Sequence, residues 1–161
     1  MRILLVRHAD AGRHDPTRWP DDTLRPLTDT GRRRHRRVAR RLRRRGLVPT
    51  RLLSSPWLRA WESAEITSRG TRGPAPEACG ALAESPELAS LRRALGDCDE
   101  AAVVGFVGHE PWLSEFASLL LTGSLAGLAI DFPKSGVMSI AAPGLHPGEG
   151  TLEFLWRPKG D

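Results

Sequence analysis

The sequence predicts a three-layer α/β/α fold around a mainly parallel sheet, because apolar strand-like segments alternate with helical segments over most of its 161 residues. The first apolar segment, residues 3–6, is a run of four aliphatic side chains, which is typical of a strand buried on both faces. The chain has no internal repeat and no interdomain linker, and its length suits one hydrophobic core. We therefore expect residues 1–161 to form a single domain.

Six segments have the composition of strands. The expected strands cover residues 2–6, 51–54, 77–79, 101–107, 137–142 and 152–156. The last two alternate apolar and polar side chains and are separated by a turn rich in proline and glycine, which indicates an antiparallel pair.

Four segments have the spacing and end signals of helices. Thr28 or Thr30 can cap a helix that runs to about residue 45 and stops at Gly46. Proline begins the other three, at residues 56, 86 and 111, because its fixed φ angle suits the first turn of a helix. Trp57 and Trp61 lie one turn apart on the second helix, and we interpret both as core-packing residues.

The composition is that of a soluble globular protein, with 40% hydrophobic and 27% charged residues. No segment approaches the ~20 apolar residues that cross a bilayer, and the apolar run at the N-terminus is too short for a signal peptide. Cys79 and Cys98, the two cysteines, have neither the spacing of a redox pair nor that of a zinc site. We expect a cytoplasmic protein, with no membrane partner and both thiols reduced.

The net charge of +5 comes from one segment. Residues 32–45 hold ten of the 24 basic residues and no acidic one, and without them 14 basic residues face 19 acidic ones. A solvated helix face is the simplest explanation of such a run. The alternatives are a surface that binds an acidic protein and, less favoured, one that binds nucleic acid.

Polar side chains follow three of the expected strands, at the point where each strand ends. Arg7 and His8 follow the first strand, and residues 54–56 follow the second, with Arg59 in the first turn of the next helix. His109 follows the fourth strand, again just before a helix. Because ligands of open α/β sheets bind beyond the carboxyl ends of the strands, we expect these four side chains to form one site.

Two arginines and two histidines are suited to phosphoryl chemistry. A guanidinium group matches the oxygens of a phosphoryl group, and a neutral imidazole can accept that group covalently. A metal site is disfavoured, because His8, Asp10, His14 and Asp15 have no second ligand cluster elsewhere and the two arginines would repel a cation. The sequence contains no phosphate-binding GxxxxGK[ST] loop.

Four motifs, in order along the chain, resemble those of the histidine phosphatase superfamily, the phosphoglycerate-mutase-like group. They are LVRHADA at residues 5–11, RPLT at residues 25–28 followed by Gly31, SSPWLRA at residues 54–60 and VGHEP at residues 107–111. The second is similar to the RPLTxxG segment of the compact SixA-type branch, the phosphohistidine phosphatases. The resemblance extends from residue 2 to about residue 142 and implies a phosphoglycerate-mutase-like fold.

This resemblance implies a metal-independent phosphatase that forms a covalent phosphohistidine on His8. Arg7, Arg59 and His109 would bind the phosphoryl oxygens, with Arg25 as a further contact, and no metal or organic cofactor is implied. The expected substrate is a protein that carries phosphohistidine. An alternative with the same fold is a phosphomonoesterase or mutase that acts on a small phosphorylated metabolite. An alternative of another class is a binding module that uses residues 32–45.

The resemblance points to Glu84 as the general acid, although a capping or solvated role ahead of Pro86 fits this residue equally well. Weaker candidates for the acid are Asp10, Asp15, Asp22 and Glu110. Only 24 residues separate Arg59 from Glu84, which is too few for a cap domain, so we expect an open pocket.

Other side chains of interest have simpler interpretations. The remaining histidines, His14, His35 and His146, lie in loops or between arginines, and we expect them to be solvated. Trp19, in a proline-rich loop, is a candidate for the rim of the pocket.

Overall fold

The computed structural model describes residues 1–83, 87–96, 99 and 101–158. Its strands form one six-stranded sheet in the order β3-β2-β4-β1-β5-β6. The strands are β1 Arg2–Arg7, β2 Arg51–Ser54, β3 Glu77–Ala78, β4 Val103–Gly108, β5 Val137–Ala141 and β6 Thr151–Trp156. β1, β2, β3 and β4 pair in parallel, whereas β5 is antiparallel to both β1 and β6. The mainly parallel sheet and the antiparallel final pair are thus confirmed.

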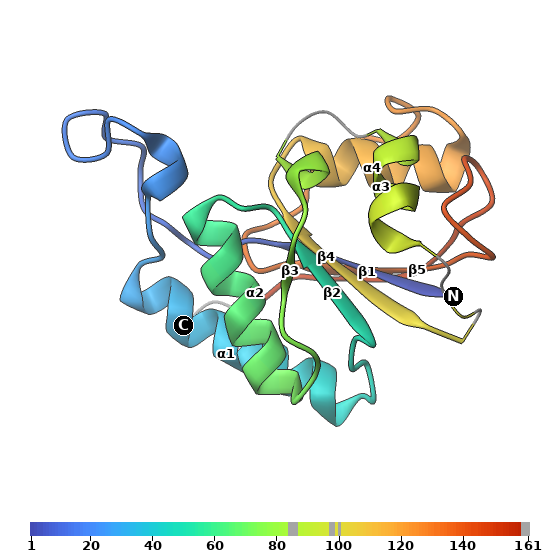
Figure 1. Ribbon diagram of the computed structural model, residues 1–161, viewed down its shortest axis with the longest axis horizontal. Coiled ribbons are helices and arrows are strands. Elements are labelled where there is room, and N and C mark those ends of the chain that lie inside the picture. Colours follow the sequence, from blue (N-terminus) through green and yellow to red (C-terminus); the bar gives the residue numbers. More distant parts are fainter. Residues whose placement is uncertain (84–86, 97–98, 100, 159–161) are drawn as a thin grey trace.

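Helices cover both faces of this sheet, which confirms the three-layer arrangement (Figure 1). α1 Asp29–Arg44 and α2 Leu58–Thr71 lie on one face, and α3 Leu88–Leu95 and α4 Trp112–Thr122 lie on the other (Figure 1). The Thr28 hydroxyl caps α1 by accepting a hydrogen bond from the Gly31 N–H at 2.9 Å. Two short 3₁₀ helices, Asp22–Leu24 and Gly80–Leu82, lie in the connections. No helix in the described part of the chain is long and apolar enough to cross a membrane.

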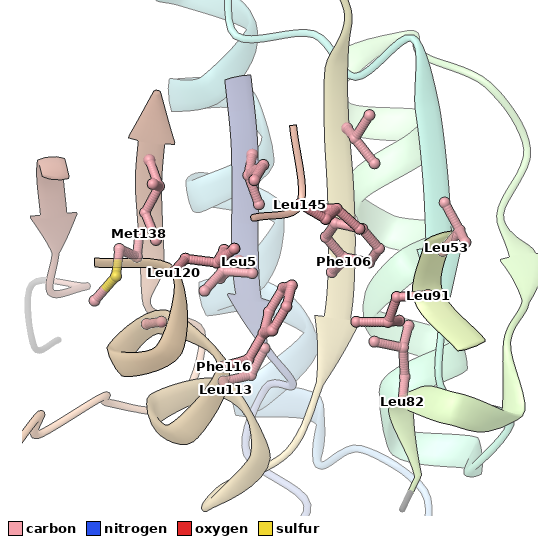
Figure 2. Close-up of a cluster of buried hydrophobic side chains, with 14 of the residues drawn as sticks. Leu5, Leu53, Leu82, Leu91, Phe106, Leu113, Phe116, Leu120, Met138 and Leu145 are labelled. Atoms are coloured by element: carbon pink, nitrogen blue, oxygen red, sulfur yellow. The ribbon is translucent and has the colours of Figure 1, made fainter. Parts of the chain in front are cut away.

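Strand β1 is buried on both faces and supplies alternate residues to two cores. Ile3 and Leu5 belong to the core between the sheet and the α3–α4 layer, where Figure 2 shows Leu5 near Phe116 of α4. Leu4 and Val6 belong to the core on the α1–α2 side. This alternation follows from the two-residue period of a strand, and it holds β1 at the centre of the molecule.

Parallel pairing brings the ends of three strands together. Arg7 of β1 is in register with Gly108 of β4, and Ser54 of β2 is in register with Val107. Just beyond, the His8 N–H donates to the Gly108 carbonyl and the Ser55 N–H donates to the Val107 carbonyl, each at 3.0 Å. The residues that follow β1, β2 and β4 therefore meet at one edge of the sheet, as expected.

The expectation that His35 is solvated is wrong. Its side chain is fully buried, with Nδ1 3.0 Å from the Ser135 hydroxyl and Nε2 3.0 Å from the Thr67 hydroxyl. Arginines flank His35 in the sequence, but helical spacing places it on the buried stripe of α1 with Gly31 and Ala39. His14 and His146 are exposed, as expected.

Replacing Gly31 with alanine should destabilise the fold, because a Cβ at this position would lie 2.2 Å from the Asp10 carbonyl oxygen. We expect Gly31→Ala to lower the free energy of unfolding by about 1–3 kcal/mol, the usual range for overpacking. Gly80→Ala is the matched control, since its Cβ would meet nothing within 4 Å. Urea unfolding of both variants measures the difference, and equal stabilities would contradict the close contact at Gly31.

The buried ring of His35 should make stability depend on pH. Burial lowers the pKa of His35 to about 4, so the unfolded chain takes up a proton that the folded protein excludes. The neutral His35 ring therefore makes its full contribution to the free energy of unfolding above pH ~6.5. As pH falls towards 4, this contribution decreases by up to roughly 3 kcal/mol. His35→Gln cannot be protonated, so its stability deficit relative to the natural protein should shrink as pH falls. Urea unfolding between pH 7.5 and 4.5 measures this, and a deficit independent of pH would contradict it.

Candidate active site

A cavity of about 560 Å³ opens where β1, β2 and β4 end. Five of the six residues predicted for the site line it, namely Arg7, His8, Arg25, Arg59 and His109. Glu84, the sixth, lies outside the described residues, although the preceding Leu82 and Ala83 line the cavity. The wall also includes His14, Trp57, Glu110, Trp112 and Lys134.

His8 is held as a neutral imidazole, and one of its ring nitrogens has no hydrogen-bond partner among the described residues. Its Nδ1 lies 2.6 Å from the Ala9 carbonyl oxygen, which can only accept a hydrogen bond, so Nδ1 carries the proton. Burial, together with the charges of Arg59, Arg7 and Lys134, lowers the pKa of His8 to about 3. At neutral pH the ring is therefore uncharged, and Nε2 has a lone pair available for reaction.

His109 lies beside His8, with 5.1 Å between the ring centroids. Its Nε2 is 2.9 Å from the Ser55 hydroxyl oxygen, which also accepts the Trp57 N–H. Since that hydroxyl has no other acceptor among the described residues, its proton goes to Nε2, and Nδ1 of His109 is left as a donor. Burial, His8 and the nearby guanidinium groups lower the pKa of His109 to about 3, so this ring is also neutral.

Two guanidinium groups are fixed at the cavity wall by backbone carbonyls. Arg7 donates to the Phe132 carbonyl at 2.5 Å, and Arg59 donates to the Asp22 carbonyl at 2.8 Å. The guanidinium carbon of Arg59 also lies 4.6 Å from the centroid of the Trp57 ring. Each arginine thus retains further N–H groups for a ligand while its position is constrained.

Asp22 organises this side of the cavity, a role that the sequence did not reveal. Its carboxylate accepts hydrogen bonds from Arg25 at 2.7 Å and from His14 at 2.8 Å, and it lies 3.2 Å from Arg59. Within the described part of the chain Arg25 makes four hydrogen bonds, two to Asp22 and one each to the carbonyls of Ala11 and Gly12. Arg25 therefore lies at the site, but most of its N–H groups donate hydrogen bonds within the loop between β1 and α1.

Lys134 is a further cation that sequence reasoning missed, because it is an isolated lysine in the loop before β5. Its ammonium group lines the cavity and lies 2.5 Å from the Asp10 carboxylate. No sequence motif marked it. Only its position beside β1 in the folded sheet could have identified it.

The two tryptophans of α2 differ from expectation. Trp57 is not a core residue but lines the cavity, and the centroid of its ring lies 4.7 Å from that of His109. Trp61 is only half-buried. The reason is that Trp57 precedes the first turn of α2, where the chain leaves the sheet edge. Trp19 lines a neighbouring hollow that shares Gly12 with the cavity, rather than the cavity itself.

Buried polar atoms without a partner are concentrated at this cavity. Of the six found among the described residues, five belong to side chains that line it. They are Nε of Arg7, Nε of Arg59, Nδ1 of His109, Nε1 of Trp112 and Oε1 of Glu110. The first four are nitrogens that can donate, so the cavity is suited to an anion with several acceptor oxygens.

Three of the candidate acids are poor proton donors at neutral pH. Hydrogen bonds from Arg25 hold the pKa of Asp22 far below its usual range, and hydrogen bonds from Thr17 lower that of Asp15. Burial acts to raise the pKa of Asp10, but Lys134, together with hydrogen bonds from Thr28 and the Gly12 backbone, outweighs this and lowers it. These carboxyl groups are ionised, so they are not proton donors.

No three metal-ligating side chains converge within residues 1–83, 87–96, 99 and 101–158. Two of the side chains considered as metal ligands form other ion pairs: Asp10 pairs with Lys134, and His14 pairs with Asp22. Cys79 is a free, buried thiol, and Cys98 lies outside the described residues.

Comparison with known proteins gives a family match and similar folds. A family model described as the histidine phosphatase superfamily (branch 1) matches residues 3–85. An uncharacterised protein of Picosynechococcus sp. is 33% identical over 142 residues, which cover 87% of this chain and 84% of that protein.

Solved structures share the fold over nearly the whole chain. The protein histidine phosphatase SixA, complexed with tungstate, has a TM-score of 0.78 at 24% identity, covering 98% of this chain and 97% of that one. A mycobacterial glucosyl-3-phosphoglycerate phosphatase complexed with VO3 has a TM-score of 0.70 at 15% identity, covering 98% of this chain and 99% of that one. At these identities, the two structures establish the likeness of fold.

The cavity should bind inorganic phosphate through Arg59. We expect Arg59→Gln to weaken phosphate binding about 10- to 100-fold, because it removes a charge-assisted hydrogen-bond donor from a buried site. Arg33→Gln makes the same change on the exposed face of α1 and should leave the affinity unchanged. Calorimetric titration at low ionic strength measures both, and equal weakening would indicate general charge attraction instead of this site.

Proposed function

Because the chain belongs to the histidine phosphatase superfamily, as its motifs predicted, we propose that it is a metal-independent phosphatase that works through a phosphohistidine on His8. The observation that carries this proposal is the free Nε2 of a neutral His8, held in a cavity with Arg7, Arg59 and His109. A neutral imidazole is a nucleophile, and the surrounding donors match a phosphoryl group.

In the first step, Nε2 of His8 attacks phosphorus, and the bond from phosphorus to the leaving group breaks. Nδ1 keeps its proton throughout, and its bond to the Ala9 carbonyl stabilises the positive charge that develops on the ring. In the second step, water attacks the phosphohistidine, the P–N bond breaks, and its electron pair returns to Nε2. Inorganic phosphate then leaves the cavity.

The donors around His8 act on the phosphoryl oxygens. We expect Arg7, Arg59 and His109, which line the cavity and have unpartnered nitrogens among the described residues, to contact them. Each positioned donor of this kind contributes typically ~10²–10³ in rate. Arg25 contributes chiefly by holding Asp22 and the loop, with one remaining N–H for the ligand. This division of roles fits phosphoryl transfer, which depends on positioning and charge neutralisation.

For the substrate, we propose a phosphohistidine-bearing protein in the cytoplasm. The fold is similar to that of SixA, a protein histidine phosphatase, and the 24 residues between Arg59 and Glu84 are too few for a cap domain over the cavity. The second candidate is a small phosphorylated metabolite, which the fold similarity to a glucosyl-3-phosphoglycerate phosphatase favours. No cofactor enters either reaction.

Trapping the phosphoenzyme tests the mechanism. Mixing the protein with a phosphomonoester and quenching in alkali should leave one acid-labile phosphate on His8, because a phosphoramidate survives base and not acid. His8→Ala should lose both the label and turnover, while His146→Ala, which changes an exposed histidine, should retain both. Turnover by His8→Ala at the natural rate would exclude the mechanism.

Comparing substrates by kcat/KM separates the two candidates. A phosphohistidine-bearing carrier protein should exceed sugar, nucleotide and acyl phosphates if the first is correct. The reverse order would favour the metabolite phosphatase and leave the role of His8 intact.

A further inference from the structure

Glu110 is a carboxyl group at the cavity that the proposed mechanism leaves unused. It follows His109 directly and lies in the turn before α4, where it lines the cavity with Arg7 and His8. Phosphomonoesters need a proton for the departing alkoxide, whereas the mechanism above names no donor. The question is whether Glu110 has the geometry and charge to provide it.

The contacts of Glu110 differ from those of every other candidate acid in the described residues. Its Oε2 accepts a hydrogen bond from the Ser114 hydroxyl at 2.5 Å, which holds the carboxyl group in place. Its Oε1 is buried and has no partner within the described part of the chain. Asp10, Asp15 and Asp22 accept hydrogen bonds from Lys134, Thr17 and Arg25, and the pKa of each is lowered, whereas that of Glu110 is raised.

Charged groups near Glu110 shift its pKa in opposite directions, and burial has the largest effect on it. Burial raises the pKa of Glu110, the hydrogen bond from Ser114 and the charge of Arg7 lower it, and Glu115 of α4 raises it, so that the net shift is upward. A buried carboxyl oxygen without a donor is costly when charged, so the protonated form is favoured. In that form the carboxyl group carries one proton and can act as a hydrogen-bond donor.

The polar atoms without a partner around the cavity also favour a protonated Glu110. The nitrogens of Arg7, Arg59, His109 and Trp112 can donate to phosphoryl oxygens, but an ionised Glu110 beside the same phosphoryl group would repel it. A protonated Glu110 instead offers a donor to the one substrate oxygen that must gain a proton. On the premise of the proposed function, we propose that Glu110 is the general acid that protonates the leaving oxygen of phosphomonoesters.

Glu110 donates a proton in the first step and accepts one in the second. As the P–N bond to His8 forms and the P–O bond breaks, the leaving oxygen takes the proton from the Glu110 carboxyl group and departs as an alcohol. The carboxylate then accepts a proton from the water that attacks the phosphohistidine. Phosphate leaves, and both His8 and Glu110 return to their starting forms.

This assignment distinguishes two classes of substrate. An alkyl phosphate leaves as a strongly basic alkoxide and requires the proton of Glu110. A phosphohistidine protonated on its second ring nitrogen leaves as neutral imidazole and requires none. Glu110 therefore extends the same site from phosphoramidates to ordinary phosphomonoesters.

The test is the dependence of kcat/KM on the leaving group in Glu110→Gln, an isosteric change that cannot donate an acidic proton. We expect kcat/KM for glycerol 2-phosphate to fall about 100-fold or more, the usual contribution of general acid catalysis. For a phosphohistidine peptide and for p-nitrophenyl phosphate, whose leaving groups need no proton, the change should stay below about threefold. Because kcat/KM reports the steps up to loss of the leaving group, the role of Glu110 in the second step does not obscure this comparison.

Two further variants make the outcome decisive. Glu65→Gln removes a half-buried carboxylate on α2 that does not line the cavity, and it should change the turnover of neither substrate class. Glu84→Gln tests the acid that the resemblance implied. Selective loss on glycerol 2-phosphate in Glu84→Gln alone, or an equal loss on all substrates in Glu110→Gln, would overturn the assignment. Full turnover by His8→Ala would instead refute the proposed function itself.

Discussion

A hydrogen bond between the His8 ring and the Ala9 carbonyl is the interaction on which the site depends. Because a carbonyl can only accept, the bond places the proton on Nδ1 and leaves Nε2 free. The backbone of His8 is fixed on both sides, since its N–H donates to the Gly108 carbonyl and its own carbonyl accepts from the Ser135 N–H. Burial beside Arg7 and Arg59 then keeps the ring uncharged, because a protonated ring would be both desolvated and repelled.

Several positive charges surround this ring, and two carboxylates partly neutralise them. Asp22 contacts Arg25, Arg59 and His14, and Asp10 pairs with Lys134. These ion pairs reduce the mutual repulsion of the cations and fix the direction of their guanidinium groups. They also tie the long loop between β1 and α1 to the cavity, because Asp22 belongs to the short 3₁₀ helix in that loop. The loop that shapes the cavity and the charges that line it thus stabilise one another.

The segment that dominates the net charge lies apart from this chemistry. Most arginines of α1 are exposed, although Arg32 binds Glu62 of α2 and Arg41 lies over Trp156 of β6. The inner stripe of Gly31, His35, Ala39 and Leu42 is buried. Gly31 joins the two regions, since its lack of a side chain lets α1 approach the backbone of Asp10 just after His8. The glycine of the RPLTxxG-like segment therefore has a packing role.

The sequence by itself determined the strand–helix alternation, the parallel core and the meeting of Arg7, His8, Arg59 and His109, because each follows from local periodicity and from where strands end. It could not place His35 inside, since one buried histidine among arginines is distinguished only by the packing of α1 on α2. It could not assign Asp22, Trp57 or Lys134 either, because their partners lie in segments remote from them in sequence. Tertiary structure alone decided the charge states of the site. Burial and hydrogen-bond partners, which no local pattern encodes, separate the ionised Asp22 from Glu110, whose pKa is raised.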